Sequence, residues 1–147
     1  MRILAVSGSL RAGTSNTALL EAVVVVAQQG VEVKLYEGLG ELPHFNPDLE
    51  GKGLPQTVRA WQQALRESDA LVVLTPEYAH GVPGVLKNAL DWVTGSGELA
   101  GKPVALFNAS SRSVCAQASL AETLTVDVCA GGNGGFAHAA VAGEGRF

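Results

Sequence analysis

"RILAVSGSLRAGTSNTALL", residues 2–20, joins a short apolar run to a loop rich in glycine and hydroxyl groups, and then to a helix-forming segment. The apolar run at residues 2–7 indicates a β-strand that is buried on both faces. Ser15 and Asn16 are good N-cap residues, so we expect the first helix to begin near them. This order of strand, loop and helix predicts a parallel α/β sheet.

The same alternation continues along the chain. Residues 31–37 alternate like a strand near a sheet edge, residues 70–75 and 103–109 form continuous apolar strands, and residues 135–142 form a weaker fifth candidate. Continuous apolar strands are typical of a sheet covered on both faces. The "VVVV" run of the first helix favours a strand locally, so its assignment as a helix depends on this alternation.

Three later helices follow from apolar spacing. Residues 55–67 are expected to bury Val58, Trp61 and Leu65. A second helix carries one apolar stripe, with Pro83 in its first turn, formed by Val82, Val85, Leu86, Ala89, Leu90 and Val93. A third is predicted at residues 113–128, with four residues facing inward: Val114, Ala118, Ala121 and Leu124.

The order β-α-β-α-β-α-β-α-β predicts one domain, residues 1–147, with a flavodoxin-like doubly wound parallel five-stranded sheet of order 2-1-3-4-5. A long connection rich in glycine and proline, residues 38–55, exceeds the usual loop length and is expected to form a functional rim. No internal repeat and no second domain is visible.

Composition narrows the classes of function. Hydrophobic residues make up 47% and charged residues 16%, which is typical of a globular protein, and the net charge of −4 argues against a nucleic-acid binder. No apolar run reaches the roughly 18 residues of a membrane span, and no signal peptide is apparent, so a soluble cytoplasmic protein is expected. Cys115 and Cys129 lack metal-ligand spacing, and we expect reduced, buried thiols and no metal site.

Ligands of such folds bind beyond the carboxyl ends of the strands, where the strand order reverses. Three loops lie there, at residues 8–16, 76–81 and 110–112. The first leads into a helix N-terminus that favours an anion. It offers the Arg11 guanidinium and neutral hydrogen-bonding groups on Ser9, Thr14, Ser15, Asn16 and Thr17. It is neither a P-loop nor a dinucleotide fingerprint, and an ordinary turn with an incidental arginine is the alternative.

The second loop places two planar side chains at the mouth of the site. Pro76 and Pro83 stiffen the segment, and a flat aromatic ring fits against Tyr78 and His80. The alternative is that Tyr78 only packs and that His80 is a solvated loop histidine.

Both loops resemble the NADPH-dependent FMN reductase family, a flavodoxin-like group that includes quinone, azo-dye and chromate reductases. The first is similar to the family pattern G-S-L-R-x-x-S-x-N and the second to P-E-Y-N-x-x-x-P-G-x-L-K-N-A-x-D-W. "ELPHFNPDLE", residues 41–50, is similar to the family's loop after strand 2. The resemblance covers residues 2–109.

The resemblance implies which residues bind FMN. The FMN phosphate would contact Ser9, Arg11, Thr14, Ser15 and Asn16, with Thr17 beside them. The isoalloxazine ring would border Pro76, Glu77, Tyr78, Ala79 and His80. Ser110 and Ser111 would close the other side of the site. Thr14 replaces the usual serine and keeps the hydroxyl, whereas Ala79 replaces the usual asparagine and loses a hydrogen bond. For Glu77 we favour a structural role, capping backbone N–H groups, over contact with the flavin or a subunit.

The family usually continues into a final helix, which covers the sheet face shared with the first helix. This chain ends at "VAGEGRF" with no helical pattern after Ala142. A bare apolar face becomes an interface, so either another subunit covers it, in a homodimer or homotetramer, or the chain is truncated.

The resemblance implies an FMN-dependent NAD(P)H oxidoreductase. It would pass electrons from NADPH or NADH to a small acceptor such as a quinone, an azo compound, chromate or free flavin. The cofactor carries such chemistry, so we name no catalytic acid or base, and His80 is the one residue to test for proton delivery. One alternative is a flavodoxin-type electron carrier, which the mild acidity of the chain disfavours. A second is a truncated relative that has lost flavin. A third is a Rossmann domain in which Glu37 binds the ribose, but the glycine spacing of this chain does not fit that motif.

Overall fold

The computed structural model describes residues 1–11, 13, 15–108, 110, 113–129 and 136–137. Its parallel sheet has the order β2-β1-β3-β4-β5, as predicted. The strands are β1 (Arg2–Ser7), β2 (Glu32–Tyr36), β3 (Ala70–Leu74), β4 (Val104–Phe107) and β5 (Phe136–Ala137). The rest of the predicted fifth strand lies outside the described residues.

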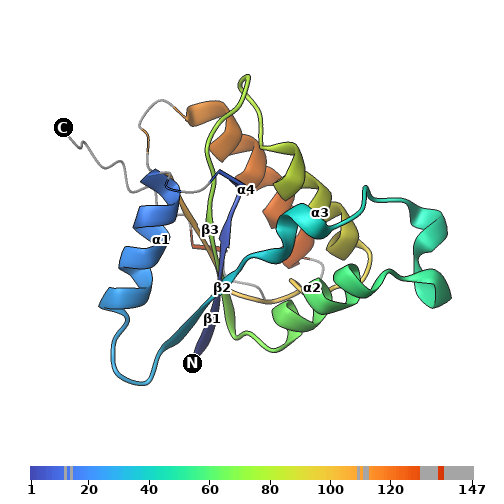
Figure 1. Cartoon of the computed structure of the whole chain (residues 1–147), viewed down its shortest axis with the longest axis horizontal. Helices are drawn as coiled ribbons and strands as arrows, with labels where there is room; N and C mark the ends of the chain where they lie inside the picture. The colour runs from blue at the N-terminus through green and yellow to red at the C-terminus, as the bar shows by residue number, and fades with distance from the viewer. Residues whose placement is uncertain (12, 14, 109, 111–112, 130–135, 138–147) are drawn as a thin grey trace.

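Four helices occupy the predicted segments of the described chain (Figure 1). They are α1 (Ser15–Val26), α2 (Gln56–Arg66), α3 (Gly84–Thr94) and α4 (Val114–Cys129). The valine run of α1 is helical, so the βαβ connection overrides its local preference for strand. No helix among these residues has the length and apolar character needed to cross a membrane.

The strands send alternate side chains to the two faces of the sheet. Helices α2, α3 and α4 cover one face, where Trp61, Leu90 and Leu124 pack in the larger core cluster (Figure 1). On the other face, Leu20 of α1 packs against Ala5 and Leu74 in a smaller cluster. Within the described residues, α1 is the helix that covers this second face.

Two expectations about α4 are wrong. Val114 is 66% exposed and Ala118 is also exposed, although Leu124 is buried and Ala121 half-buried as predicted. The buried stripe instead runs at intervals of four through Ala116, Leu120, Leu124 and Val128. This stripe begins two residues after Val114, because packing against the sheet selects one of several small-residue faces of the helix.

The prediction of buried thiols is also wrong for Cys115. This cysteine lies in the first turn of α4 and is a free, exposed thiol. The burial of the Cys129 side chain lies outside what the structure describes.

The long connection packs on α3 and contains three short 3₁₀ turns, η1 (Gly38–Glu41), η2 (Pro47–Leu49) and η3 (Gly51–Gly53). Leu39 and Leu42 are buried in the core, and the Pro43 carbonyl accepts hydrogen bonds from Trp92 Nε1 at 2.8 Å and Asn88 Nδ2 at 3.0 Å. The segment is therefore anchored by packing, and its role as a functional rim stays a prediction.

Candidate functional site

The loops after β1, β3 and β4 emerge from the same edge of the parallel sheet. From β1 the chain turns outward to β2 and later returns on the other side of β1 to form β3. This reversal opens a crevice between the loop after β1 and the loop after β3, and ligands of open α/β sheets bind in such a crevice.

The first loop leaves β1 in close contact with β3. The Gly8 N–H donates to the Leu74 carbonyl at 2.7 Å, and a Cβ at Gly8 would lie 2.5 Å from Thr75 Oγ1. Only glycine fits this approach without movement of a neighbour. Ser9 then turns the chain, because its hydroxyl accepts the Arg11 N–H at 3.2 Å.

The predicted phosphate residues are placed in part. Arg11 is exposed, Gly13 has a φ of 67°, and α1 begins at Ser15 as expected. Ala12 and Thr14, together with the side chains of Ser15, Asn16 and Thr17, lie outside the described part of the chain. Their contact with a phosphate therefore stays a prediction.

A cavity of about 350 Å³ opens beside the first loop, toward β2. Ser9, Arg11 and Gly13 contribute to its lining, and so do Glu21 and Glu37. Because carboxylates repel anions and a guanidinium attracts them, a phosphate is favoured next to Arg11 and disfavoured next to the two glutamates.

Tyr36 at the end of β2 also lines this cavity. Burial raises the pKa of its phenol, and the nearby Glu41 carboxylate raises it further. The phenol therefore stays protonated at neutral pH and adds no negative charge to the wall.

The second loop contains a tight two-residue turn. The Tyr78 N–H donates to the Gly81 carbonyl at 3.1 Å, and the Gly81 N–H donates back to Tyr78 at 2.9 Å. Between them, Ala79 and His80 have φ values of 49° and 60°. Two positive φ values identify a type I′ turn, which usually contains glycine or asparagine.

Tyr78 connects the second loop to the first. Its hydroxyl lies 3.4 Å from Ser9 Oγ, although the two residues are far apart in the sequence. The side chain is 54% exposed, so the ring also presents a surface to solvent. Pro76 is half-buried and precedes the turn. These contacts bring together two of the loops that were predicted to form one site.

Glu77 has the structural role that the sequence favours. Its Oε2 accepts the Ala116 N–H of α4 at 2.8 Å, and its Oε1 lies 3.1 Å from His80 Nδ1. The Glu77 side chain is 11% exposed, whereas that of His80 is 86% exposed. The carboxylate therefore attaches the second loop to the start of α4.

The third loop depends on Asn108, which is not among the predicted site residues. Its Oδ1 accepts the Ser110 N–H and its Nδ2 donates to the Ser113 carbonyl, both at 2.9 Å. An amide directly after a buried strand and before serines is a known turn signal that was available in the sequence. Ser110 is exposed and Ser111 lies outside the described residues, so their contact with the flavin stays a prediction.

Comparison with known proteins links this geometry to a family. Residues 1–138 match the family described as NADPH-dependent FMN reductase. The chain is 37% identical over 113 residues to an NAD(P)H-dependent FMN reductase of Pseudomonas aeruginosa, and 36% identical over 113 residues to a quinone reductase of Escherichia coli K12. These matches cover 76% and 75% of this chain, and 60% of each relative.

A solved structure agrees with these matches. The flavoenzyme NAD(P)H:(acceptor) oxidoreductase of Paracoccus denitrificans superimposes with a TM-score of 0.78 and 29% identity, covering 98% of this chain and 76% of that one. The chain thus spans about 60% of the length of the curated relatives described above.

Proposed function

Because this chain belongs to the NADPH-dependent FMN reductase family, we propose that it binds FMN and passes electrons from a nicotinamide coenzyme to a small acceptor. The observation that carries the proposal is the contact between Ser9 and Tyr78 at the point where the strand order reverses. It joins the two loops that carry the family motifs into one continuous surface.

The residues present fit FMN. The first loop supplies an exposed guanidinium, a glycine with positive φ and the start of a twelve-residue helix, which together favour a phosphate. The exposed ring of Tyr78 supplies a flat wall for an aromatic system. When bound, FMN supplies hydride transfer from reduced nicotinamide and onward electron transfer to the acceptor.

The protein's own residues position the reactants. Arg11 and Ser9 would hold the phosphate, and Tyr78, Ala79 and Pro76 would border the ring. The Glu77 carboxylate keeps this second loop attached to α4. His80 is exposed to solvent and is the residue to test for proton delivery. No protein nucleophile is required.

We propose a quinone as the first acceptor to assay, because a relative that is 36% identical carries the name quinone reductase. Azo compounds, chromate and free flavin complete the panel. Both NADPH and NADH belong in the assay as electron donors.

The same proposal includes a homodimer or homotetramer in the cytoplasm. Val24 and Val25 of α1 are 43% and 83% exposed, on the side of the sheet with the smaller cluster, and exposed apolar side chains favour an interface. The free thiol of Cys115 fits a reducing compartment. Sedimentation of a chain with confirmed intact mass tests this part, and a monomer contradicts it.

The decisive experiment is an anaerobic visible spectrum. The purified chain is incubated with FMN, freed of excess flavin and scanned before and after addition of NADPH or NADH. Retained flavin that bleaches at a rate matching quinone turnover supports the reductase. Retained flavin that stays oxidised contradicts the reductase and favours an electron carrier, and absence of retained flavin contradicts FMN binding.

A further inference from the structure

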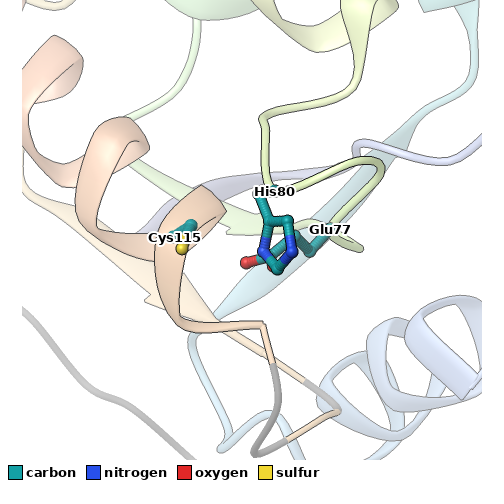
Figure 2. Close-up of side chains that lie close together, drawn as sticks. All are labelled: Glu77, His80 and Cys115. Carbon is teal, nitrogen blue, oxygen red and sulfur yellow. The ribbon is translucent and has the colours of Figure 1, made fainter.

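Glu77, His80 and Cys115 come together at the junction between the second loop and α4 (Figure 2). One carboxylate oxygen, one imidazole nitrogen and the thiol sulfur all lie within 4.8 Å of one another. The residues come from two segments that are distant in the sequence, which is why no ligand spacing was visible there. All three side chains belong to elements with defined positions.

The cluster has the dimensions of a small cation site. His80 Nδ1 and Glu77 Oε1 are 3.1 Å apart, and ligand atoms around a tetrahedral zinc ion are separated by roughly 3.3–3.6 Å, given its bond lengths. The Cys115 sulfur reaches the third ligand position of a tetrahedron after a shift of about 1 Å. Rotation of an exposed side chain is enough for such a shift. His80 and Cys115 are exposed, so water has access to the fourth corner.

The Glu77 carboxylate is already oriented for binding a cation. Its Oε2 is held by the Ala116 N–H at 2.8 Å, which fixes the direction of the carboxylate and leaves Oε1 facing His80. Such a supporting hydrogen bond orients a metal ligand and lowers the entropic cost of binding. The type I′ turn between Tyr78 and Gly81 carries His80, and the His80 imidazole lies within 3.1 Å of the Glu77 carboxylate.

We propose that Glu77, His80 and Cys115 form a binding site for a divalent cation of borderline softness, such as Zn²⁺ or Co²⁺. Thiolate and imidazole ligands favour these ions, whereas Mg²⁺ and Ca²⁺ require oxygen ligands throughout. Two negative ligands, the carboxylate and the thiolate, balance the charge of the ion.

Binding of the ion changes the protonation of its ligands and leaves the oxidation state of the metal and of the sulfur unchanged. The Cys115 thiol releases its proton to solvent as the metal–sulfur bond forms. The neutral imidazole of His80 binds the ion through one ring nitrogen and carries its single hydrogen on the other. If Nδ1 is the ligand, the ring is in the Nε2–H tautomer, and the ion replaces the Nδ1 contact with Glu77 Oε1. A water molecule occupies the remaining position.

Cobalt titration of the full, untagged chain tests the site, with the thiols kept reduced by a phosphine. One Co²⁺ per chain should produce thiolate-to-cobalt charge-transfer absorption, and Zn²⁺ should abolish it by displacement. Cys115→Ser should remove this absorption. His80→Ala should weaken binding by more than the roughly tenfold that loss of an outer-shell partner costs. The matched controls Cys129→Ser and His44→Ala should leave the titration unchanged.

Absence of charge-transfer absorption overturns the proposal, as does absorption that survives in Cys115→Ser or disappears in Cys129→Ser. A second measurement uses the unmodified sequence and does not depend on a variant that folds. Zn²⁺ should slow alkylation of Cys115 by iodoacetamide, followed by peptide mass spectrometry. An unchanged rate at saturating Zn²⁺ contradicts the site. Both readouts are independent of FMN and of reductase activity.

Discussion

The Glu77 carboxylate accepts a hydrogen bond at 2.8 Å from the backbone N–H of Ala116, in the first turn of α4. The first N–H groups of a helix have no partner within the helix, and a negative charge near them is favourable. Glu77 follows β3, so this one contact ties the end of a central strand to a helix that begins after β4. It fixes the turn that carries Tyr78.

Replacement of Glu77 by glutamine tests the contribution of this charge. Glu77→Gln keeps the size of the side chain but removes the charge, and it should lower the free energy of unfolding by about 1 kcal/mol, the typical value of a helix cap. Urea denaturation measures the change. Glu122→Gln, at an exposed position of the same helix, is the control and should be nearly neutral. Equal stability of the two variants would contradict the capping role.

Replacement of Ala79 should be able to stabilise the protein, because its φ of 49° is unfavourable for alanine. The left-handed region costs most L-residues about 1–2 kcal/mol, and asparagine tolerates it better. Ala79→Asn should therefore raise the free energy of unfolding by about 0.5–1 kcal/mol. Ala60→Asn, on an exposed position of helix α2, should lower it, because asparagine is a poorer helix former than alanine. A decrease for both variants in urea would show that the turn is unstrained.

The arrangement of elements was predictable because it depends on local patterns. The strand order and the four helices follow from apolar runs and from spacing that a parallel sheet must satisfy. The inward face of α4 could not be predicted in this way, because alanine, valine and cysteine occur on several sides of this helix. Contact with the sheet determines which face of α4 is buried. Val114 and Cys115 were predicted to be buried and are exposed, so the buried face differs from the one that the sequence suggests.

The site was predictable at the level of loops. Parallel strands end at one edge, so the loops containing Ser9, Tyr78 and Ser110 were expected to lie near one another. Individual contacts such as Glu77 with Ala116, or His80 with Glu77, depend on backbone turns and on side-chain rotamers. These are set by packing between segments that are distant in the sequence, and no local pattern encodes them.

The close approach at Gly8 predicts a strong effect of one methyl group. Gly8→Ala places a Cβ 2.5 Å from Thr75 Oγ1, and such overpacking costs about 1–3 kcal/mol of unfolding free energy. Gly53→Ala is the matched control, because a Cβ there meets no atom within 4 Å, and it should change stability by less than about 0.5 kcal/mol. Thermal or urea unfolding distinguishes the two variants. A Gly8→Ala variant as stable as the wild type would show that Thr75, directly after β3, moves aside at no cost in free energy.

Arg11 should contribute to FMN affinity through the phosphate alone. Arg11→Ala should weaken FMN binding by about 10- to 100-fold, the effect of losing a hydrogen bond to a charged group. Riboflavin lacks the phosphate and should bind both proteins equally. Flavin fluorescence titration measures the affinities, with Lys34→Ala on β2 as the control for lost positive charge. Parallel losses for FMN and riboflavin would place Arg11 away from the phosphate.

Asp127 should make the protein less stable as the pH rises. Asp127 is only 4% exposed. Its Oδ2 has no hydrogen-bond partner among the residues that the structure describes. Burial raises the pKa of this carboxyl, a hydrogen bond to Thr94 opposes the rise, and the charges of Asp91 and Lys87 respectively add to it and oppose it. Since the folded state then binds the proton more tightly than the unfolded state, the free energy of unfolding falls between the unfolded pKa, about 3.9, and the raised folded pKa.

Asp127→Asn removes the charge and should therefore be more stable than the wild type at pH 7, by on the order of 1 kcal/mol. The difference should shrink as the pH falls toward about 4, because the wild-type carboxyl is then protonated in the folded state. Urea unfolding at a series of pH values measures this dependence, and Asp48→Asn, at an exposed position, should show no such stabilisation. A variant that is less stable than the wild type at pH 7 would mean that the ionised carboxylate has a favourable partner in solution.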